Sequence, residues 1–167
     1  MFDGLVLGVD PGVASTGVAV VRRSGHRAAV EWAATIRTAA GQEEAARLRH
    51  IHDAVSAAIG EWRPDAVAME RLAWGRNVVS AMSVARACGV VLLAAQQAGL
   101  AVSEYPPTEV KLGIAGSGSA GKDQVRRALQ RLLGVDGVPT EPDAADAVAV
   151  AMCHLHQSRL KQLVARA

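Results

Sequence analysis

Apolar residues follow two different spacings along this chain, and the spacing predicts where strands and helices lie. Short apolar runs bounded by glycine, proline or polar residues are typical of buried strands. Five such runs occur, at Leu5–Asp10, Gly17–Arg22, Ala29–Arg37, Ala66–Glu70 and Ala101–Tyr105. In the third run apolar residues alternate with others, which predicts that they share one face of a sheet. They are Val30, Trp32, Ala34 and Ile36.

The longer segments between these strands have helical spacing. Apolar residues recur every three or four positions from Glu43 to Trp62, which predicts an amphipathic helix. Further helices are predicted at Val78–Gly99, Thr108–Leu112, Lys122–Leu133 and Pro142–Lys161, with a loop at Gly113–Gly121. Three strands followed by alternating helices and strands predict an α/β fold, a mixed five-stranded sheet with helices on both faces.

Composition sets limits on the class of protein. The chain has 167 residues, enough for one well-packed domain, and half of them are hydrophobic. No uninterrupted apolar run reaches the ~20 residues of a membrane span, since Gln96 and Gln97 interrupt the longest. No basic and apolar leader precedes the first strand. Cys88 and Cys153 fall in helical patterns and are expected to be reduced core residues. We therefore expect a cytoplasmic protein that does not enter the membrane.

Four acidic residues stand at the ends of predicted elements. Asp10 and Glu70 end two apolar strands, while Asp143 and Asp146 lie three residues apart at the start of the last helix, on one face. A buried carboxylate without a partner is strongly disfavoured unless it is protonated or binds a cation. Oxygen ligands suit Mg²⁺ or Mn²⁺. Two such ions about 4 Å apart can activate water and stabilise the leaving oxygen of a phosphodiester. The four acids therefore predict a metal site.

Each acid taken singly has an ordinary structural explanation. Asp10 precedes Pro11 and Gly12, as an aspartate that starts a turn does. Glu70 is followed by Arg71 as a possible ion-pair partner, and acids in a first helical turn complement the helix dipole. The net charge of +2 adds little, although four acids in one place leave the remaining surface more basic. A single metal site explains all four acids together, whereas the alternative needs a separate structural role for each of them.

The segments that carry these acids resemble the RuvC family of bacterial Holliday-junction resolvases, in the ribonuclease-H-like superfamily. The similar segments are residues 8–12, 69–71, 113–122, 142–147 and 153–154. The resemblance implies a single ribonuclease-H-like nuclease domain over residues 1–167, with a core at about 4–158 and a helical tail. It implies a homodimeric, Mg²⁺-dependent endonuclease that nicks two opposed strands of a four-way DNA junction and works with RuvA and RuvB.

The resemblance also implies roles for individual residues. Asp10, Glu70, Asp143 and Asp146 match the catalytic acids of the family, and Lys111 and Lys122 match lysines near the scissile phosphate. Family members often carry phenylalanine three positions after the glutamate, where this chain has Ala73. The adjacent Trp74 is a candidate to stack on an unpaired base instead, and the alternative is packing at the protein surface or in the core. Arg76 and Asn77, which follow it, are further candidate DNA contacts.

The loop before the Lys122 helix nearly matches a nucleotide-binding P-loop. A P-loop follows a buried strand and has serine or threonine after its lysine, whereas here Asp123 follows Lys122. We interpret the loop as a cradle for a DNA phosphate, with Ser117, Gly118 and Lys122 as contacts; a surface loop without contacts is the alternative. A zinc site is not predicted from His50 and His52 or from His154 and His156, because each is an i, i+2 pair whose side chains diverge on a helix.

Three other functions are alternatives to junction cleavage. A ribonuclease that acts on RNA–DNA hybrids would use the same acids, and a non-catalytic junction-binding protein would be expected to lack some of them. A sugar-kinase fragment would need a second, similar domain.

For the dimer, the helix Val78–Gly99 is the candidate interface, and the alternative is burial of the same residues against the sheet. Its candidate contact residues are Met82, Ala85, Val90 and Leu93.

Overall fold

The computed structural model describes residues 4–71 and 78–164, and the side chains as far as residue 157. The sheet contains five strands, β1 (Gly4–Asp10), β2 (Ser15–Ser24), β3 (Arg27–Arg37), β4 (Ala66–Glu70) and β5 (Val102–Tyr105). Their order across the sheet is β3-β2-β1-β4-β5. The first three strands pair antiparallel, whereas β1, β4 and β5 run parallel. The predicted mixed five-stranded sheet is confirmed.

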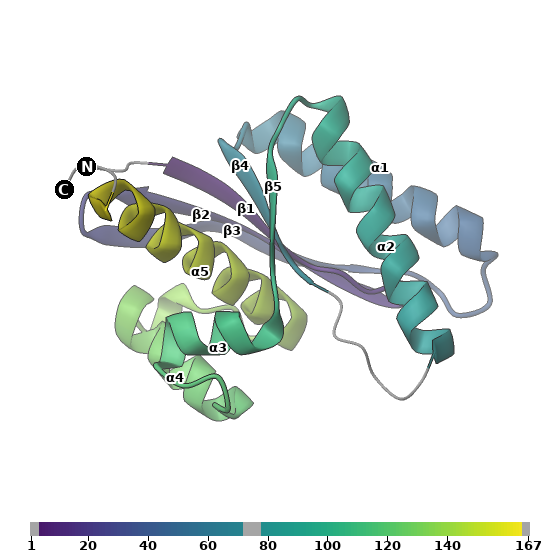
Figure 1. Cartoon of the computed structure of the whole chain (residues 1–167). Helices are drawn as coiled ribbons and strands as arrows, with labels where there is room; N and C mark the ends of the chain where they lie inside the picture. The colour runs from purple at the N-terminus through teal and green to yellow at the C-terminus, as the bar shows by residue number, and fades with distance from the viewer. Residues whose placement is uncertain (1–3, 72–77, 165–167) are drawn as a thin grey trace.

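Helices cover both faces of this sheet, as predicted (Figure 1). On one face lie α1 (Glu44–Trp62) and α2 (Val78–Gln97), which pack over a core that includes Leu7, Val9 and Met69. The opposite face carries α3 (Pro107–Ala115), α4 (Lys122–Leu133) and α5 (Pro142–Val164). A short 3-10 helix, η1 (Val135–Gly137), links the last two and was not predicted. The strand β1, which is buried except at Asp10, therefore separates two apolar cores.

The third helix is longer than its sequence pattern predicted. The expected loop at residues 113–121 begins at Gly116, because residues 113–115 continue α3. Ile114 is buried, and a Cβ at Gly113 would lie 3.2 Å from the Cys153 sulfur, so this turn packs closely on α5. Gly116 has a φ of 76°, the left-handed conformation that glycine adopts at a helix end. Packing on α5 thus extends a helix that local spacing predicted to be short.

A β-bulge corrects one prediction for β3. Val20 pairs with Trp32, but the next residue, Val21, pairs with Val30, so Glu31 is left as an extra residue. An extra residue reverses the face on which the preceding side chains lie. Val30 consequently packs on the α5 side, whereas Trp32 packs on the α1 side with Ala34 and Ile36. The prediction that all four share one face was wrong for Val30.

The second helix has one buried and one exposed apolar side. Its buried residues, among them Ala87 and Val91, pack over the sheet. Val79 and Met82 are 75% and 51% exposed. Within the described segments α2 is the one helix whose length and composition would allow it to cross a membrane, and it is also a helix that covers a sheet. The predicted state of the cysteines is confirmed, since Cys88 and Cys153 are buried free thiols.

Candidate active site

Two of the predicted acids lie side by side because their strands are parallel neighbours. Asp10 is the last residue of β1 and Glu70 is the last residue of β4. The two strands pair in register, with Val9 opposite Met69. Carboxyl ends of parallel neighbours meet at one edge of a sheet, where ligands commonly bind in α/β proteins. The strand pairing alone therefore brings these two carboxylates together.

Two glycines allow α5 to bring the other acids to the same edge. A Cβ at Gly17 would lie 1.9 Å from the main-chain oxygen of Asp143, and one at Gly8 would lie 2.2 Å from that of Ala147. No side chain larger than hydrogen fits at these positions while α5 keeps its place. Gly17 also pairs directly with Asp10 across β1 and β2. The first turn of α5 thus rests on the strand beside Asp10.

These elements enclose an open cleft of about 320 Å³. Three acids and both predicted lysines line it: Asp10, Glu70, Asp146, Lys111 and Lys122. Lys111 comes from α3 and Lys122 is the first residue of α4, so the helices on one face of the sheet add positive charge to an acidic edge. The remaining lining residues are Pro107, Val110, Val125 and Ala149. Three of the four predicted acids and both predicted lysines are therefore assembled in one cleft, and Asp143 is not among its lining residues.

Two of the acids have hydrogen-bond partners in this structure. The Ser15 hydroxyl, at the start of β2, donates a hydrogen bond to Oδ2 of Asp143. The Lys122 ammonium lies 3.3 Å from Oδ2 of Asp146 and forms an ion pair with it. Nothing in the sequence pattern pointed to Ser15, since a serine at the start of a strand is common. The glycines within β1 and β2 did carry a signal, because glycine inside a strand often marks a close approach of backbone.

Crowding of carboxylates changes the proton affinity of the site. Burial raises the pKa of Asp10 from 3.8 to about 7, and repulsion from Glu70, Asp146 and Asp143 adds to this, whereas Lys122 lowers it. Burial also raises the pKa of Glu70, with a further contribution from Asp146 and opposition from Lys111 and Lys122. Asp146 raises the pKa of Lys122 in turn. The site therefore carries an excess of negative charge that a cation would relieve.

The donor set fits a divalent oxygen-binding cation. In the part of the chain that the structure describes, no three His, Cys, Asp or Glu side chains already converge on one point. Asp143 is turned to Ser15 and Asp146 to Lys122. Oxygen-only donors are the ligands that Mg²⁺ or Mn²⁺ prefers.

The other predicted site residues lie away from the cleft or outside the described residues. Ser117 lines a different hollow, and a Cβ at Gly118 would lie 3.2 Å from the main-chain oxygen of Thr108. Trp74, Arg76 and Asn77 lie outside the described residues, as does Ala73.

The side chains of the histidine pair on α5 diverge, as predicted. Nδ1 of His154 lies 2.9 Å from the Tyr105 hydroxyl, while Nδ1 of His156 faces the main-chain oxygen of Gly113 at 3.4 Å. His154 is buried, so its hydrogen bond with Tyr105 ties α5 to the end of β5 inside the core. Neither histidine lines the acidic cleft.

The strand order and the acid cluster at the carboxyl ends of the inner strands β1 and β4 define a ribonuclease-H-like nuclease fold. Residues 6–154 match the model of the family described as crossover junction endodeoxyribonuclease RuvC. The chain belongs to this family of nucleases. A crossover junction endodeoxyribonuclease RuvC of Syntrophomonas wolfei is 42% identical over 159 residues, covering 95% of this chain and 92% of the relative. The corresponding protein of Moorella thermoacetica is 44% identical over 151 residues, 90% of each chain.

Solved structures agree with the sequence comparisons. A structure of T. thermophilus RuvC in complex with a Holliday junction substrate has a TM-score of 0.90 and 33% sequence identity, covering 95% of this chain and 96% of that one. The yeast mitochondrial Holliday junction resolvase Ydc2 has a TM-score of 0.65 at 14% identity, over 94% of this chain and 82% of that one. The second likeness concerns the fold alone, which is the ribonuclease-H-like fold that the sequence predicted.

Proposed function

We propose that this protein resolves four-way DNA junctions by hydrolysing one phosphodiester bond in each of two opposed strands. The observation that carries the proposal is the cleft in which Asp10, Glu70 and Asp146 face Lys111 and Lys122. A fold that matches a junction-bound RuvC over 95% of this chain supports the choice of substrate. Family membership supports the reaction, since these enzymes are endodeoxyribonucleases.

The proposed cofactor is Mg²⁺, with Mn²⁺ as a substitute, as one or two ions per site. Asp10, Glu70, Asp143 and Asp146 would hold it, since all four are oxygen donors at one edge of the sheet. A bound divalent cation supplies an activated water and stabilises charge on the leaving oxygen of a phosphodiester. Burial is the main cause of the raised pKa of Asp10, and repulsion from the other acids adds to it; a cation would relieve that repulsion, which supports binding at this place.

The two lysines give the acidic cleft the means to accept a phosphate. Carboxylates repel a DNA backbone, so cations beside them are needed to bring the scissile phosphate near. The side chain of Lys122 is 82% exposed and its ammonium is held by a single acid, Asp146, within ion-pair distance. It therefore has the freedom to contact a phosphate at the mouth of the cleft. Lys111 lies across the same cleft and lowers the pKa of Glu70.

Further DNA contacts are proposed for residues around the cleft. Trp74 takes the place of the family's stacking phenylalanine, with Arg76 and Asn77 beside it on the chain. Ser117 and Gly118 contact the DNA backbone from the loop between α3 and α4. A Trp74→Ala variant is expected to lose junction cleavage more than duplex binding, because stacking on an unpaired base is worth roughly 1–3 kcal/mol.

A homodimer is proposed, with α2 as its interface. Two coordinated cuts in a junction of approximate two-fold symmetry need two active sites related by a two-fold axis, which an isologous dimer supplies. The exposed side of α2 carries Val78, Val79, Met82 and Leu93, each at least half exposed. A second copy of this helix would remove these apolar side chains from water. Val90, which was included in the predicted interface, packs instead against the core of its own chain.

The cellular setting follows from the family. RuvA and RuvB are the proposed partners, since the resemblance implies that branch migration presents the junction to the nuclease. A cytoplasmic location is proposed on the same ground.

The exposed side of α2 is assigned to protein contact rather than to lipid, because the helix carries Arg86 in an ion pair with Glu44 of α1.

Cleavage of a synthetic four-way DNA junction tests the proposed function, set beside linear duplex and an RNA–DNA hybrid. With Mg²⁺, paired nicks in opposed strands are expected in the junction and not in the other two substrates. Cleavage of the hybrid alone would reassign the protein to the ribonucleases. Tight junction binding without any cut would indicate the non-catalytic binding protein. The Asp143→Asn variant serves as the control for contaminating nuclease.

A further inference from the structure

The cationic side chains of α4 point in two directions. Lys122 faces the acidic cleft, while Nη1 of Arg126 donates a hydrogen bond to the main-chain oxygen of Pro139 at 3.2 Å. Gln124, Arg127 and Arg131 follow the i, i+3, i+7 pattern and so form another stripe along the helix. This second stripe belongs to neither the catalytic cleft nor the apolar core.

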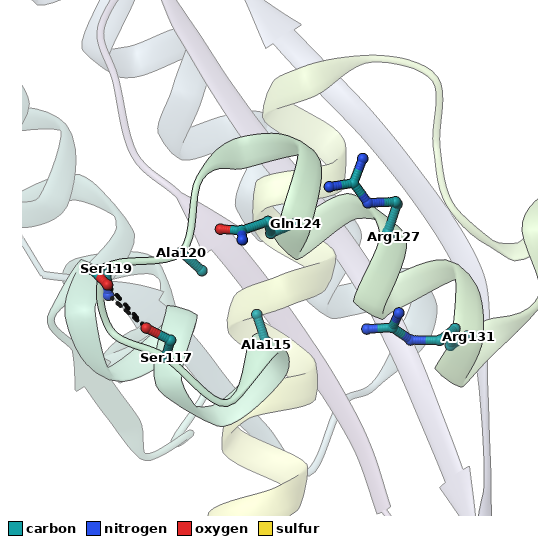
Figure 2. A pocket seen from close by; sticks show the side chains of 7 residues that line it. All are labelled: Ala115, Ser117, Ser119, Ala120, Gln124, Arg127 and Arg131. Carbon is teal, nitrogen blue, oxygen red and sulfur yellow. Dashed lines mark hydrogen bonds between the residues drawn. The ribbon is translucent and has the colours of Figure 1, made fainter.

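Arg127 and Arg131 line a separate hollow of about 330 Å³ between α4 and the loop that follows α3. Figure 2 shows both guanidinium groups projecting from α4 on the side where this loop lies. The other lining residues are Ala115, Ser117, Ser119, Ala120 and Gln124. No acid is among the residues that line the hollow. It is therefore a basic and polar hollow, in contrast to the acidic cleft at the other side of α4.

The two arginines differ from several others on the surface in lacking a counter-charge. Four arginines elsewhere form ion pairs with acids, namely Arg22, Arg37, Arg49 and Arg86. For Arg127 and Arg131, no acid among the residues with described side chains lies within ion-pair distance. Two guanidinium groups one helical turn apart, with no acid between them, create a positive potential that favours an anion.

The opposite wall of the hollow offers neutral hydrogen-bond donors. The hydroxyl oxygens of Ser117 and Ser119 lie 3.0 Å apart, and the Ser119 N–H donates to the Ser117 hydroxyl at 3.3 Å. Hydroxyl hydrogens rotate, so either serine can donate to an anionic oxygen. Oε1 of Gln124 accepts the Gly121 N–H at 2.8 Å, which orients this amide and leaves its NH₂ group as a further donor.

We propose that this hollow binds a backbone phosphate of DNA, outside the catalytic cleft, on the strand as it leaves the site. The inference rests on the proposed function and extends its DNA surface across α4 from Lys122 to Arg131. Guanidinium groups bind phosphate oxygens in a bidentate manner, and hydroxyl donors complete such sites without reading the bases. Lys122 and Gln124 both belong to the first turn of α4, so a strand that crosses this turn can contact the cleft on one side of the helix and the hollow on the other.

The salt dependence of junction binding tests this inference. The affinity of the full chain for a four-way junction is measured without divalent cation at several salt concentrations. R127Q/R131Q is compared with R49Q/R63Q, which removes two exposed arginines from the opposite face of the sheet. The first variant is expected to bind on the order of ten-fold more weakly, with its logarithmic salt slope smaller by about 1–2, since each phosphate contact contributes about 0.9. The control variant should match the parent.

The outcomes separate the inference from the function on which it rests. A slope equal to that of R49Q/R63Q would overturn the phosphate site while junction binding stands. Failure of the parent chain to bind a junction would overturn both. Binding of inorganic phosphate that R127Q/R131Q abolishes, with an unchanged DNA slope, would assign the hollow to a small anion and contradict the DNA proposal. If R127Q/R131Q does not fold, R127Q alone is measured, with about half the change in slope expected.

Discussion

Gly17 supports Asp143 directly, because a Cβ at Gly17 would lie 1.9 Å from the Asp143 main-chain oxygen. The same glycine pairs with Asp10 across β1 and β2. The hairpin of β1 and β2 therefore meets a residue more than a hundred positions away in one backbone contact, and the distance between the acid of β1 and those of α5 depends on it. A residue with no side chain determines how close two groups of carboxylates come.

We expect Gly17→Ala to displace the first turn of α5 and to lower both activity and stability. Overpacking against main chain typically costs about 1–3 kcal/mol, and the shift of Asp143 should reduce cleavage by at least about ten-fold, as small misplacements do. Thermal unfolding and junction cleavage measure the two effects. Gly60→Ala, in α1 with nothing within 4 Å of the new Cβ, is the matched control. It should be slightly stabilising and fully active. Equal behaviour of the two variants would contradict the role of Gly17.

Ser15 is expected to position the carboxylate of Asp143, to which its hydroxyl donates. Ser15→Ala removes a hydrogen bond to a charged group, which is worth about 1.5–3 kcal/mol. It should therefore weaken the response to metal, with roughly a ten-fold higher Mg²⁺ concentration needed for half-maximal cleavage. Ser15→Thr keeps the hydroxyl and should retain the parent's Mg²⁺ dependence. An alanine variant with the parent's metal dependence would remove Ser15 from the site.

The raised pKa of Asp10 predicts a pH-dependent stability in metal-free protein. Its folded-state pKa is about 7 and its ordinary value is 3.8. Between these values the unfolded chain has lost this proton while the folded protein still holds it, so the free energy of unfolding falls as pH rises. Asp10→Asn removes this loss and should be more stable at neutral pH by about 2–4 kcal/mol. Urea unfolding of chelator-treated proteins measures this difference.

The control for this prediction is the same pair of proteins in acid, at a pH below the ordinary pKa of the carboxyl. There Asp10 is protonated in both folded and unfolded states, so the advantage of Asp10→Asn should be largely absent. Added Mg²⁺ at neutral pH should raise the melting temperature of the parent more than that of the variant. A stability difference that does not vary with pH would show that folding does not raise the pKa of Asp10.

The exposed apolar side of α2 predicts that charged substitutions on it break the dimer. Met82→Glu with Leu93→Glu places like charges on both copies of an isologous contact, which disfavours association strongly. Analytical ultracentrifugation should find a dimer for the parent and a monomer for the double variant, whose junction cuts should become single and uncoordinated. Val135→Glu, at a residue that is 70% exposed in η1, is the control. A double variant that remains dimeric would place the interface elsewhere.

Much of this fold could be predicted from sequence because its signals are local. Alternating and helical spacings predicted every strand and the five α-helices, and an acid at the end of each of two parallel strands predicted the meeting of Asp10 and Glu70. Tertiary contacts decided the rest. The extra turn of α3 depends on packing against Cys153. The face of the sheet on which Val30 lies depends on the β-bulge in the pairing of β3 with β2.

The site was predictable to the same degree. Acids and lysines are recognised by residue type and by their place on strands and helices. The structure brings five of the six together in one cleft, with Asp143 in the first turn of α5. Ser15 was not predictable, because its role depends on a contact with a residue 128 positions away. The hollow beside Arg127 and Arg131 was missed for a similar reason, since the wall opposite them is contributed by another segment.

The Mg²⁺ dependence of junction cleavage by Asp146→Asn tests the central claim most directly. The claim is that the acid cluster carries out metal-dependent hydrolysis, whereas phosphate contacts carry binding. The parent should make paired nicks that require Mg²⁺. The variant should bind the junction at least as tightly in the absence of metal, because one charge that repels phosphate is gone, and should not cut it at any Mg²⁺ concentration. Cleavage by Asp146→Asn at the parent's rate, or Mg²⁺-independent cleavage by the parent, would contradict the account.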